Sequence, residues 1–136
     1  WAEAAQYTKS IIGDAFPNVT DDRFWETFAR NNFEERDGQI IARYDPAIAE
    51  GMEGEDATAV PPDLWPIWDM LSAMPVLVVR GAVSDLLSAE TVAEMRRRHP
   101  DNFSAVEVPH RGHAPMLDED EAVQAITTFL DGLYSE

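Results

Sequence analysis

One stretch of the sequence, PVLVVRG at residues 75–81, limits the possible folds more than any other. Its apolar residues follow one another without the alternation of a half-exposed strand, which is typical of parallel strands covered on both faces. Ser88 is placed to cap a helix that stops at His99, before Pro100. FSAVEV at 103–108 then reads as a second strand. Because a strand-helix-strand segment of this length pairs its strands in parallel through a right-handed crossover, we expect an α/β fold.

Helices are expected before and after this unit. PDLWPIWDMLSAM at 62–74 has Pro62 at its start and apolar residues at helical spacing. Asp118 and Glu121 have capping-box spacing before an amphipathic helix that closes the chain. The predicted order is therefore strand, helix, strand, loop, helix. Two parallel strands leave their faces and both edges exposed, so the sequence predicts an incomplete core with further strands upstream of Trp1.

Residues 1–62 are expected to form a different kind of segment, mostly helical and rich in aromatic residues. Gly13 is a candidate C-cap of a first helix. Thr20 can cap a second helix that carries aromatic residues on one side. Residues 39–44, QIIARY, are either a short strand or an extended connection. Residues 45–62 carry Gly, Pro and acidic residues without periodicity, which predicts a loop.

Composition limits the kind of protein. The sequence contains no Cys, which excludes disulfides, thiolate metal sites and a cysteine nucleophile. Twenty-six acidic residues against ten basic ones give a net charge of −16, which argues against partners such as nucleic acids and anionic membranes. No apolar stretch is long enough to span a membrane and no signal peptide is visible, so a cytoplasmic location is expected. The chain begins with Trp1 and its first methionine is Met52, so we expect it to be part of a longer protein.

Two loops of the α/β part carry candidate catalytic residues. Asp85 follows the first strand, and His113 follows the second. Ligands of open α/β sheets bind beyond the carboxyl ends of the strands, and parallel strands bring both loops to the same edge. A carboxylate that accepts one imidazole proton fixes the tautomer, so that the other nitrogen can remove a proton from a nucleophile or a water. Gly112 would let the backbone turn tightly and leave the imidazole projecting.

Each of these residues also has a purely structural interpretation. Asp85 alone could form a turn or cap a helix, and His113 alone could be a surface residue of its loop. His110 and His113 could also suggest a metal site, but a third ligand would have to be an ordinary acidic residue, and no metal is expected. The joint placement of Asp85 and His113 on consecutive strand ends makes the catalytic interpretation as strong as the structural one.

These residues carry a resemblance to a known family. PVLVVRGAVSDLLSAET, followed by VEVPHRGHAPMLDED and a helix ending TTFLDGL, is similar to the C-terminal portion of an α/β-hydrolase over residues 74–134. The resemblance implies that Asp85 is the acid of a catalytic triad and His113 its histidine. It also implies that residues 63–136 are the C-terminal part of the core and that the enzyme needs no cofactor.

Residues 1–62 resemble, less specifically, the helical cap that many of these enzymes insert before the strand of the acid, with 45–62 as an acidic loop. Such caps close over the substrate and line its pocket with apolar side chains. The candidates for this role are Phe24, Trp25, Phe28, Trp65 and Trp68. The simpler interpretation is that these side chains pack the cap itself.

The sequence departs from the family in one respect. The nucleophile elbow, Gly-x-Ser-x-Gly or an Asp version of it, is absent, because none of the six serines lies between glycines two residues away. The resemblance therefore implies a hydrolase of a small, mostly apolar substrate, an ester in the first place, whose nucleophile lies in a missing N-terminal part of the same protein. Serine and aspartate nucleophiles both stay open. The alternative is an α/β-hydrolase-like binding or signalling protein without turnover.

Overall fold

The computed structural model describes residues 1–45, 47–48 and 62–134. Its contacts divide the chain into two compact units, one of residues 1–13 and 18–62, the other of residues 14–17 and 63–136. Most of the predicted acidic loop at 45–62 lies outside the described residues.

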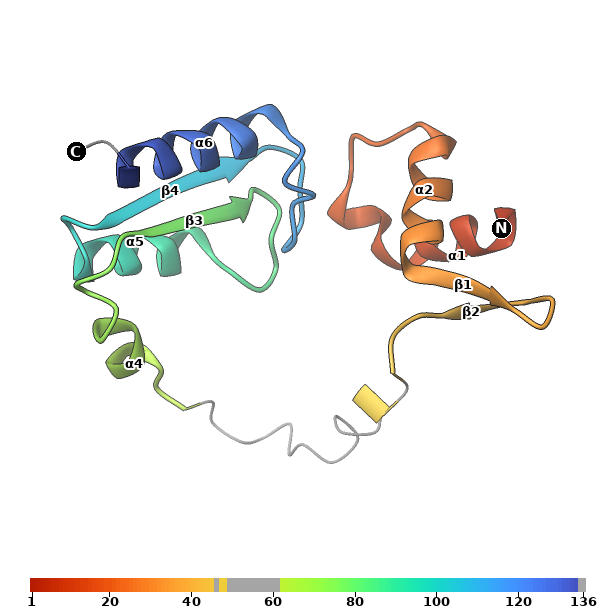
Figure 1. Cartoon of the computed structure of the whole chain (residues 1–136), viewed down its shortest axis with the longest axis horizontal. Helices are drawn as coiled ribbons and strands as arrows, with labels where there is room; N and C mark the ends of the chain where they lie inside the picture. Colours follow the sequence, from red (N-terminus) through yellow and green to blue (C-terminus); the bar gives the residue numbers. More distant parts are fainter. Residues whose placement is uncertain (46, 49–61, 135–136) are drawn as a thin grey trace. The chain divides into compact units, whose positions relative to one another are not determined.

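The first unit contains two helices and a hairpin (Figure 1). Its elements are helix α1 (Ala2–Ile12), helix α2 (Asp22–Asn32), and strands β1 (Phe33–Arg36) and β2 (Gln39–Ala42). The 3-10 turn η1 (Gly13–Ala15) follows α1, and its residues Asp14 and Ala15 belong to the second unit. The expected helical character of the N-terminal part is confirmed for both helices.

Both predicted helix caps of this unit differ in detail. Asp21, rather than Thr20, caps α2, because its Oδ1 accepts the N–H of Arg23 at 2.9 Å. Gly13 does end α1, but it keeps a right-handed φ of −57° and the chain continues into η1. The glycine therefore does not serve as the left-handed cap that its residue type suggested.

Only one of the two strands of the hairpin was predicted. Residues 39–44 were expected to be a strand or an extended connection, and β2 confirms the strand, but its antiparallel partner β1 was not expected. Arg36 pairs with Gln39, so Asp37 and Gly38 form the two-residue turn, with φ of 54° and 75°. Both values are positive, which suits a type I′ turn and its Asp-Gly preference.

The second unit is built on a parallel strand pair (Figure 1). Its elements are helix α4 (Trp65–Asp69), strand β3 (Val76–Gly81), helix α5 (Ala89–Arg98), strand β4 (Phe103–Val108) and helix α6 (Asp120–Tyr134). In the described part of the chain, no helix has the length and hydropathy that crossing a membrane would need.

The pairing of β3 with β4 confirms the predicted α/β fold class. The register runs without a bulge from Val76 opposite Phe103 to Gly81 opposite Val108. Helices α5 and α6 lie on opposite sides of the strand pair (Figure 1). Ser88 caps α5 as predicted, since its Oγ accepts the N–H of Thr91 at 3.1 Å.

Two helix boundaries differ from the prediction. Helix α4 begins at Trp65 rather than Pro62, and Pro66 is the proline in its first turn. It is shorter than the pattern at 62–74 indicated, because the following turns run to β3, and the Ser72 carbonyl accepts from the Asn102 amide at 2.8 Å. Helix α6 begins at Asp120, slightly later than a cap at Asp118 implies.

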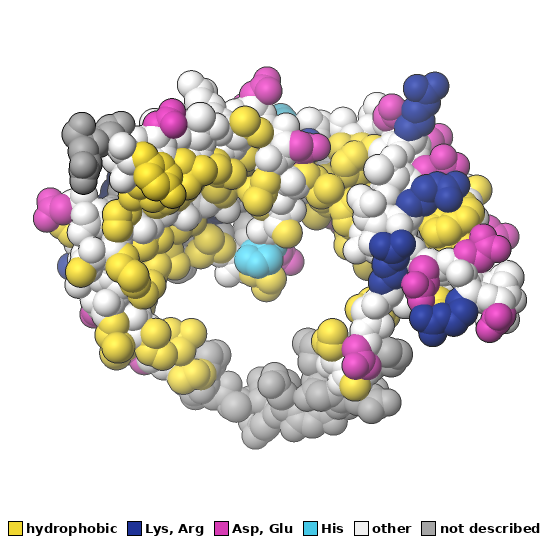
Figure 2. Space-filling view, viewed as in Figure 1, with side chains coloured by type: hydrophobic (Ala, Val, Ile, Leu, Met, Phe, Trp, Pro, Cys, Tyr) yellow, Lys and Arg dark blue, Asp and Glu magenta, His cyan; other side chains and the backbone are white. Residues whose placement is uncertain are grey.

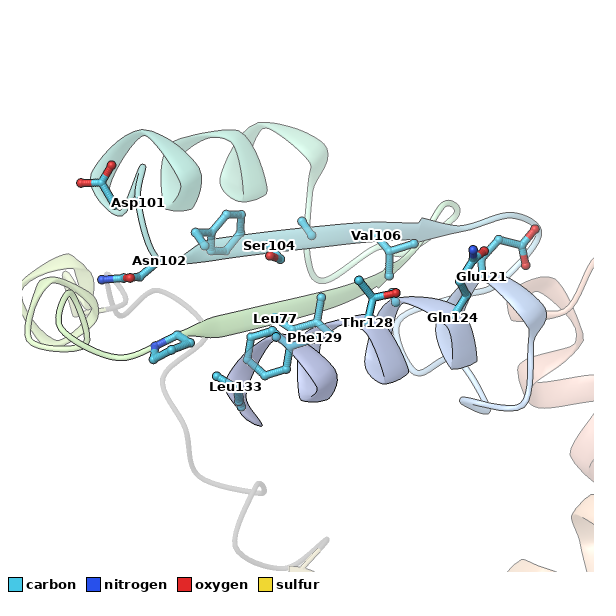
Figure 3. A pocket seen from close by; sticks show the side chains of 15 residues that line it. Leu77, Asp101, Asn102, Ser104, Val106, Glu121, Gln124, Thr128, Phe129 and Leu133 are labelled. Atoms are coloured by element: carbon cyan, nitrogen blue, oxygen red, sulfur yellow. The ribbon is translucent and has the colours of Figure 1, made fainter. Parts of the chain in front are cut away.

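The chain covers its own sheet only partly. Phe103, Val108 and Ala122 are buried, but the first four residues of β3 are only half-buried. An open hollow of about 680 Å³ lies between the strands and α6, lined among others by Leu77 and Phe129 (Figure 3). Hydrophobic side chains also gather on the visible surface of this unit (Figure 2). A strand as apolar as β3 is expected to be covered on both faces, and this unit supplies part of that cover.

Candidate active site

Two loops leave the sheet side by side at its carboxyl edge. Gly81 ends β3 and Val108 ends β4 opposite it, so residues 82–87 and 109–119 start from the same edge. The Ala82 N–H donates to the Val108 carbonyl at 2.9 Å. The Val83 N–H donates to the Arg111 carbonyl, also at 2.9 Å. The predicted juxtaposition of the two loops by parallel pairing is therefore present.

Gly81 allows this close approach, and Gly112 allows its own loop to pack against Ala15. A Cβ on Gly81 would lie 1.9 Å from the Gly112 carbonyl oxygen and 2.3 Å from that of Arg111. A Cβ on Gly112 would lie 2.5 Å from the Ala15 Cβ, and the Gly112 N–H donates to the Ala15 carbonyl at 2.7 Å. Gly112 is thus needed for close packing and not, as the sequence suggested, for a tight turn. The left-handed residues of this loop are His110, with φ of 57°, and Leu117, with φ of 63°.

Arg80 braces the loop that carries Asp85. This buried side chain donates from Nε to the Leu87 carbonyl at 2.6 Å and from a terminal nitrogen to the Ala82 carbonyl at 3.5 Å. Its other terminal nitrogen pairs with Glu107, which lies opposite it on β4. One guanidinium therefore holds both ends of the 82–87 loop and ties them to the neighbouring strand.

An ion pair closes the loop that carries His113. Arg111 Nε donates to Glu119 Oε1 at 2.6 Å, and the Met116 N–H donates to the same oxygen at 3.2 Å. Burial raises the pKa of the Glu119 carboxyl, but hydrogen bonds from backbone N–H groups and Arg111, together with the arginine charge, outweigh it. The pKa of Glu119 therefore lies below its ordinary value. The Arg111 guanidinium also lies 5.6 Å from the Phe16 ring centroid.

Asp85 and His113 lie on adjacent loops, and both side chains are exposed. The side chain that reaches His113 is that of Ser84, whose Oγ lies 3.5 Å from His113 Nδ1. Among the described residues, no hydrogen bond joins Asp85 to His113. Sequence reasoning missed Ser84. Its signal was its position directly before Asp85 in a loop that starts at the carboxyl end of a predicted strand.

Ser84 is not placed to be the nucleophile. Its Oγ accepts the Leu87 N–H at 3.0 Å and lies next to Nδ1, the nitrogen whose proton an acid partner would hold. A nucleophile would instead face Nε2, on a sharp turn with backbone N–H groups aimed at the developing oxyanion. The two loops therefore place polar groups beside the His113 ring.

In the described parts of the chain, no group of three His, Asp or Glu side chains is arranged to hold a metal ion. His110 and His113 thus have no third ligand there.

The comparisons with known proteins agree with this architecture. No family model matches the sequence. The 3-hydroxybutyrate-oligomer hydrolase of Cupriavidus necator is 41% identical over 91 residues, which cover 65% of this chain and 31% of that protein. The crystal structure of an α/β hydrolase from Novosphingobium aromaticivorans covers 96% of this chain with a TM-score of 0.83 and 37% identity. The chain has the fold of the C-terminal portion of an α/β hydrolase.

This assignment confirms the resemblance seen in the motifs around Asp85 and His113. The structure of E-2-(acetamidomethylene)succinate hydrolase also matches, with 27% identity and a TM-score of 0.65 over 94% of this chain. The chain spans 45% of the Novosphingobium protein, 44% of E-2-(acetamidomethylene)succinate hydrolase and 31% of the Cupriavidus protein. Its elements correspond to the C-terminal portion of the fold.

The three aromatic candidates of α2 pack against one another. In α2, the ring centroids of Phe24 and Trp25 lie 5.2 Å apart, and those of Phe24 and Phe28 lie 6.0 Å apart. Trp25 is buried at 2% exposure, whereas Phe24 and Phe28 are half-exposed. Trp25 therefore belongs to the core of the first unit. The two phenylalanines are the members of this cluster that are partly exposed to solvent.

Trp65 and Trp68 lie at the other end of the strands from Asp85 and His113. Trp68 stacks on the buried His99 with centroids 4.7 Å apart and meets Phe103, the first residue of β4, edge-on at 5.9 Å. Arg98 covers the Trp65 ring at 4.6 Å. The six residues of β4 extend over about 20 Å. The structure thus does not bring these tryptophans to the edge that holds Asp85 and His113.

Proposed function

We propose that the protein carrying this chain hydrolyses a small, mostly apolar ester with an α/β-hydrolase triad. In this triad Asp85 orients His113, and the nucleophile comes from a segment that precedes Trp1. The observation that carries the proposal is the convergence of the 82–87 and 109–119 loops at one edge. Backbone hydrogen bonds and the absence of a side chain at Gly81 hold these loops close together. Such preorganisation is what proton transfer requires.

The proposed mechanism uses both nitrogens of His113. With its proton on Nδ1 held toward Asp85, the imidazole takes the nucleophile's proton at Nε2 as the nucleophile attacks the ester carbonyl. The protonated ring then gives that proton to the leaving alcohol, and the acyl-enzyme is hydrolysed by a water that His113 deprotonates in the same way. The Asp85 carboxylate stabilises the imidazolium in both half-reactions. The oxyanion donors, like the nucleophile, lie outside this chain in this proposal.

Two observations support an ester of modest size. The Cupriavidus relative is a hydrolase of 3-hydroxybutyrate oligomers, and hydroxy acids join to one another as esters. The net charge of −16 disfavours strongly anionic substrates and leaves neutral, apolar esters as the better match. We propose a serine as the nucleophile rather than an aspartate, which the sequence preceding Trp1 and labelling of the intact protein with a fluorophosphonate would test.

The two histidines of the 109–119 loop provide a matched test in the intact protein. His113→Asn is expected to lower kcat for p-nitrophenyl butyrate by about 10⁴-fold, because the proton-transfer group is lost. His110→Asn removes a histidine of the same loop, and Asn tolerates the φ of 57° at that position, so activity should be unchanged. Equal activity of the two variants would exclude the mechanism and favour a binding protein without turnover.

The cap role is also a proposal. Residues 1–62 would cover the substrate, with the half-exposed Phe24 and Phe28 lining its pocket and the buried Trp25 supporting them. Phe28→Ala should then raise KM for p-nitrophenyl octanoate more than for p-nitrophenyl acetate. Trp25→Ala should weaken both activities equally, because removing a buried tryptophan costs about 3–5 kcal/mol and disrupts the cap. An identical pattern for the two variants would contradict the lining role.

A further inference from the structure

Ser84 is held in a fixed position beside the histidine. Its Oγ accepts the Leu87 N–H at 3.0 Å, its N–H donates to the Gly81 carbonyl at 3.0 Å, and the same Oγ lies 3.5 Å from His113 Nδ1. Because the backbone of the loop fixes the hydroxyl oxygen, this oxygen is an acceptor with a defined location and not a freely rotating surface group.

The backbone of the histidine loop is held against the loop of Ser84. The Val83 N–H donates to the Arg111 carbonyl at 2.9 Å, which joins the residue before Ser84 to the loop of His113. The close approach of Gly81 to Gly112 leaves no room for the two loops to move past each other. The backbone contacts therefore hold the loop of Ser84 beside the loop of His113, where Oγ lies 3.5 Å from Nδ1.

From this geometry we infer that Ser84 is a positioning residue for His113, a neutral acceptor of the Nδ1 proton that acts beside Asp85. This inference rests on the proposed function, in which Nδ1 must carry the proton so that Nε2 can act as the base. A serine oxygen has two lone pairs, so it can accept from Nδ1 while it accepts from the Leu87 N–H.

The two acceptors contribute differently. A neutral hydroxyl selects the tautomer and the ring orientation, whereas the Asp85 carboxylate also stabilises the positive charge that develops on the ring. Loss of Ser84 should therefore cost little while Asp85 is present and more once the carboxylate has been removed. A residue that merely shaped the loop would show no such dependence on Asp85.

The test uses single and double variants of the intact enzyme. Ser84→Ala is expected to lower kcat for p-nitrophenyl butyrate by about 2- to 10-fold with KM unchanged, the range for one neutral hydrogen bond. In the Asp85→Asn background the same change should lower kcat by a larger factor. Ser84→Thr keeps the hydroxyl and should restore kcat in both backgrounds.

A second readout separates positioning from loop structure. With ¹⁵N-labelled histidine, the fraction of His113 protonated at Nδ1 is expected to fall in Ser84→Ala and to fall further in the double variant. This fraction decides the question even where the Asp85→Asn enzymes turn over too slowly to measure. The His113 ring signals are assigned as those missing from the spectrum of the His113→Asn protein.

Ser88 provides the matched control. Its Oγ accepts the backbone N–H of Thr91 at 3.1 Å, the same three-residue spacing as Ser84 to Leu87, but its hydroxyl caps α5. Ser88→Ala should change neither kcat nor the His113 tautomer.

Two results would overturn the inference: unchanged kcat and tautomer in Ser84→Ala in both backgrounds, or a lower kcat with an unchanged tautomer fraction. The proposed function fails separately, if His113→Asn remains active.

Discussion

Gly81 is the residue that most tightly couples the two loops of the site. A Cβ there would lie 1.9 Å from a backbone oxygen, and backbone cannot move aside as a flexible side chain can. We therefore expect Gly81→Ala to lower the free energy of unfolding of the intact protein by about 3 kcal/mol, measured by urea denaturation. The same substitution should separate the loops and reduce kcat.

Gly13 is the control for this prediction. It has a right-handed φ of −57°, and the nearest atom to an added Cβ is Lys9 Cγ at 3.9 Å. Gly13→Ala should leave stability unchanged or raise it by up to about 1 kcal/mol, because the unfolded chain loses freedom. Equal stabilities of the two variants would show that the loops are not in close contact.

Glu119 predicts a pH dependence of stability. Folding lowers the pKa of this carboxyl from its ordinary 4.5. The ionised Glu119 therefore adds to the free energy of unfolding above pH 4.5, and this stabilisation is lost as the pH falls through the folded pKa. Glu119→Gln should cost about 3 kcal/mol at pH 7, since it leaves the partly buried Arg111 without its charged partner. The difference from the unsubstituted protein should shrink below pH 4.5 in urea unfolding. A difference that is constant from pH 7 to 3 would contradict the role of the ion pair.

Asp85 and His113 could be placed from the sequence, but Ser84 could not. Topology alone brings the ends of parallel strands to one edge, so a residue just beyond each strand is located by counting. Which side chain then faces the imidazole depends on rotamers and on the 3.0 Å bond from Leu87 to the Ser84 hydroxyl, and neither leaves a periodic signal. The role of Gly112 was misjudged for the same reason, because its neighbour Ala15 lies far away in the sequence.

At the scale of elements, Arg80 links strand β3, its loop and strand β4. A lysine at this position would keep a charge near Glu107, but one ammonium nitrogen cannot replace the three separate guanidinium nitrogens that contact Leu87, Glu107 and Ala82. Arg80→Lys is therefore expected to speed amide hydrogen exchange across 82–87 and to cost about 1–2 kcal/mol of stability.

The control for Arg80 is an arginine on a helix surface. Arg97 is 69% exposed and pairs with Glu94 within α5, so Arg97→Lys should leave exchange in the 82–87 loop unchanged. If Arg80→Lys also leaves that exchange unchanged, the guanidinium does not brace the loop.

Helices and strands that carry a clear apolar pattern or a typical capping residue could be predicted from the sequence. Elements without such a pattern could not. The strands at 76–81 and 103–108 follow from apolar runs, and the cap at Ser88 follows from residue type. Strand β1, FEER, has no apolar alternation, so only the Asp-Gly turn after it indicated a hairpin. The length of α4 was predicted too great, because the apolar spacing continues through residues that instead form the turns before β3.

At the scale of the whole molecule, the strand pair needs more cover than this chain provides. The residues Val76–Val79 are only half-buried, and the hollow beside α6 is open. The chain spans less than half of each matched relative, and those relatives therefore contain structure that has no counterpart here. We expect the apolar face of β3 to be covered by elements of the intact protein outside this chain.

This expectation can be measured on the purified chain of 136 residues. A complete domain of this length should unfold in urea with a slope of about 1–3 kcal/mol per M, because the slope scales with the surface exposed on unfolding. The chain alone buries too little of β3 to reach that value, so its transition should be broad, with a slope below about 1 kcal/mol per M, and it should not hydrolyse p-nitrophenyl butyrate. The intact protein, measured beside it, should show a steep transition and activity. A steep, cooperative transition of the isolated chain would mean that its two-stranded sheet is sufficient by itself, and the requirement for further strands would be wrong.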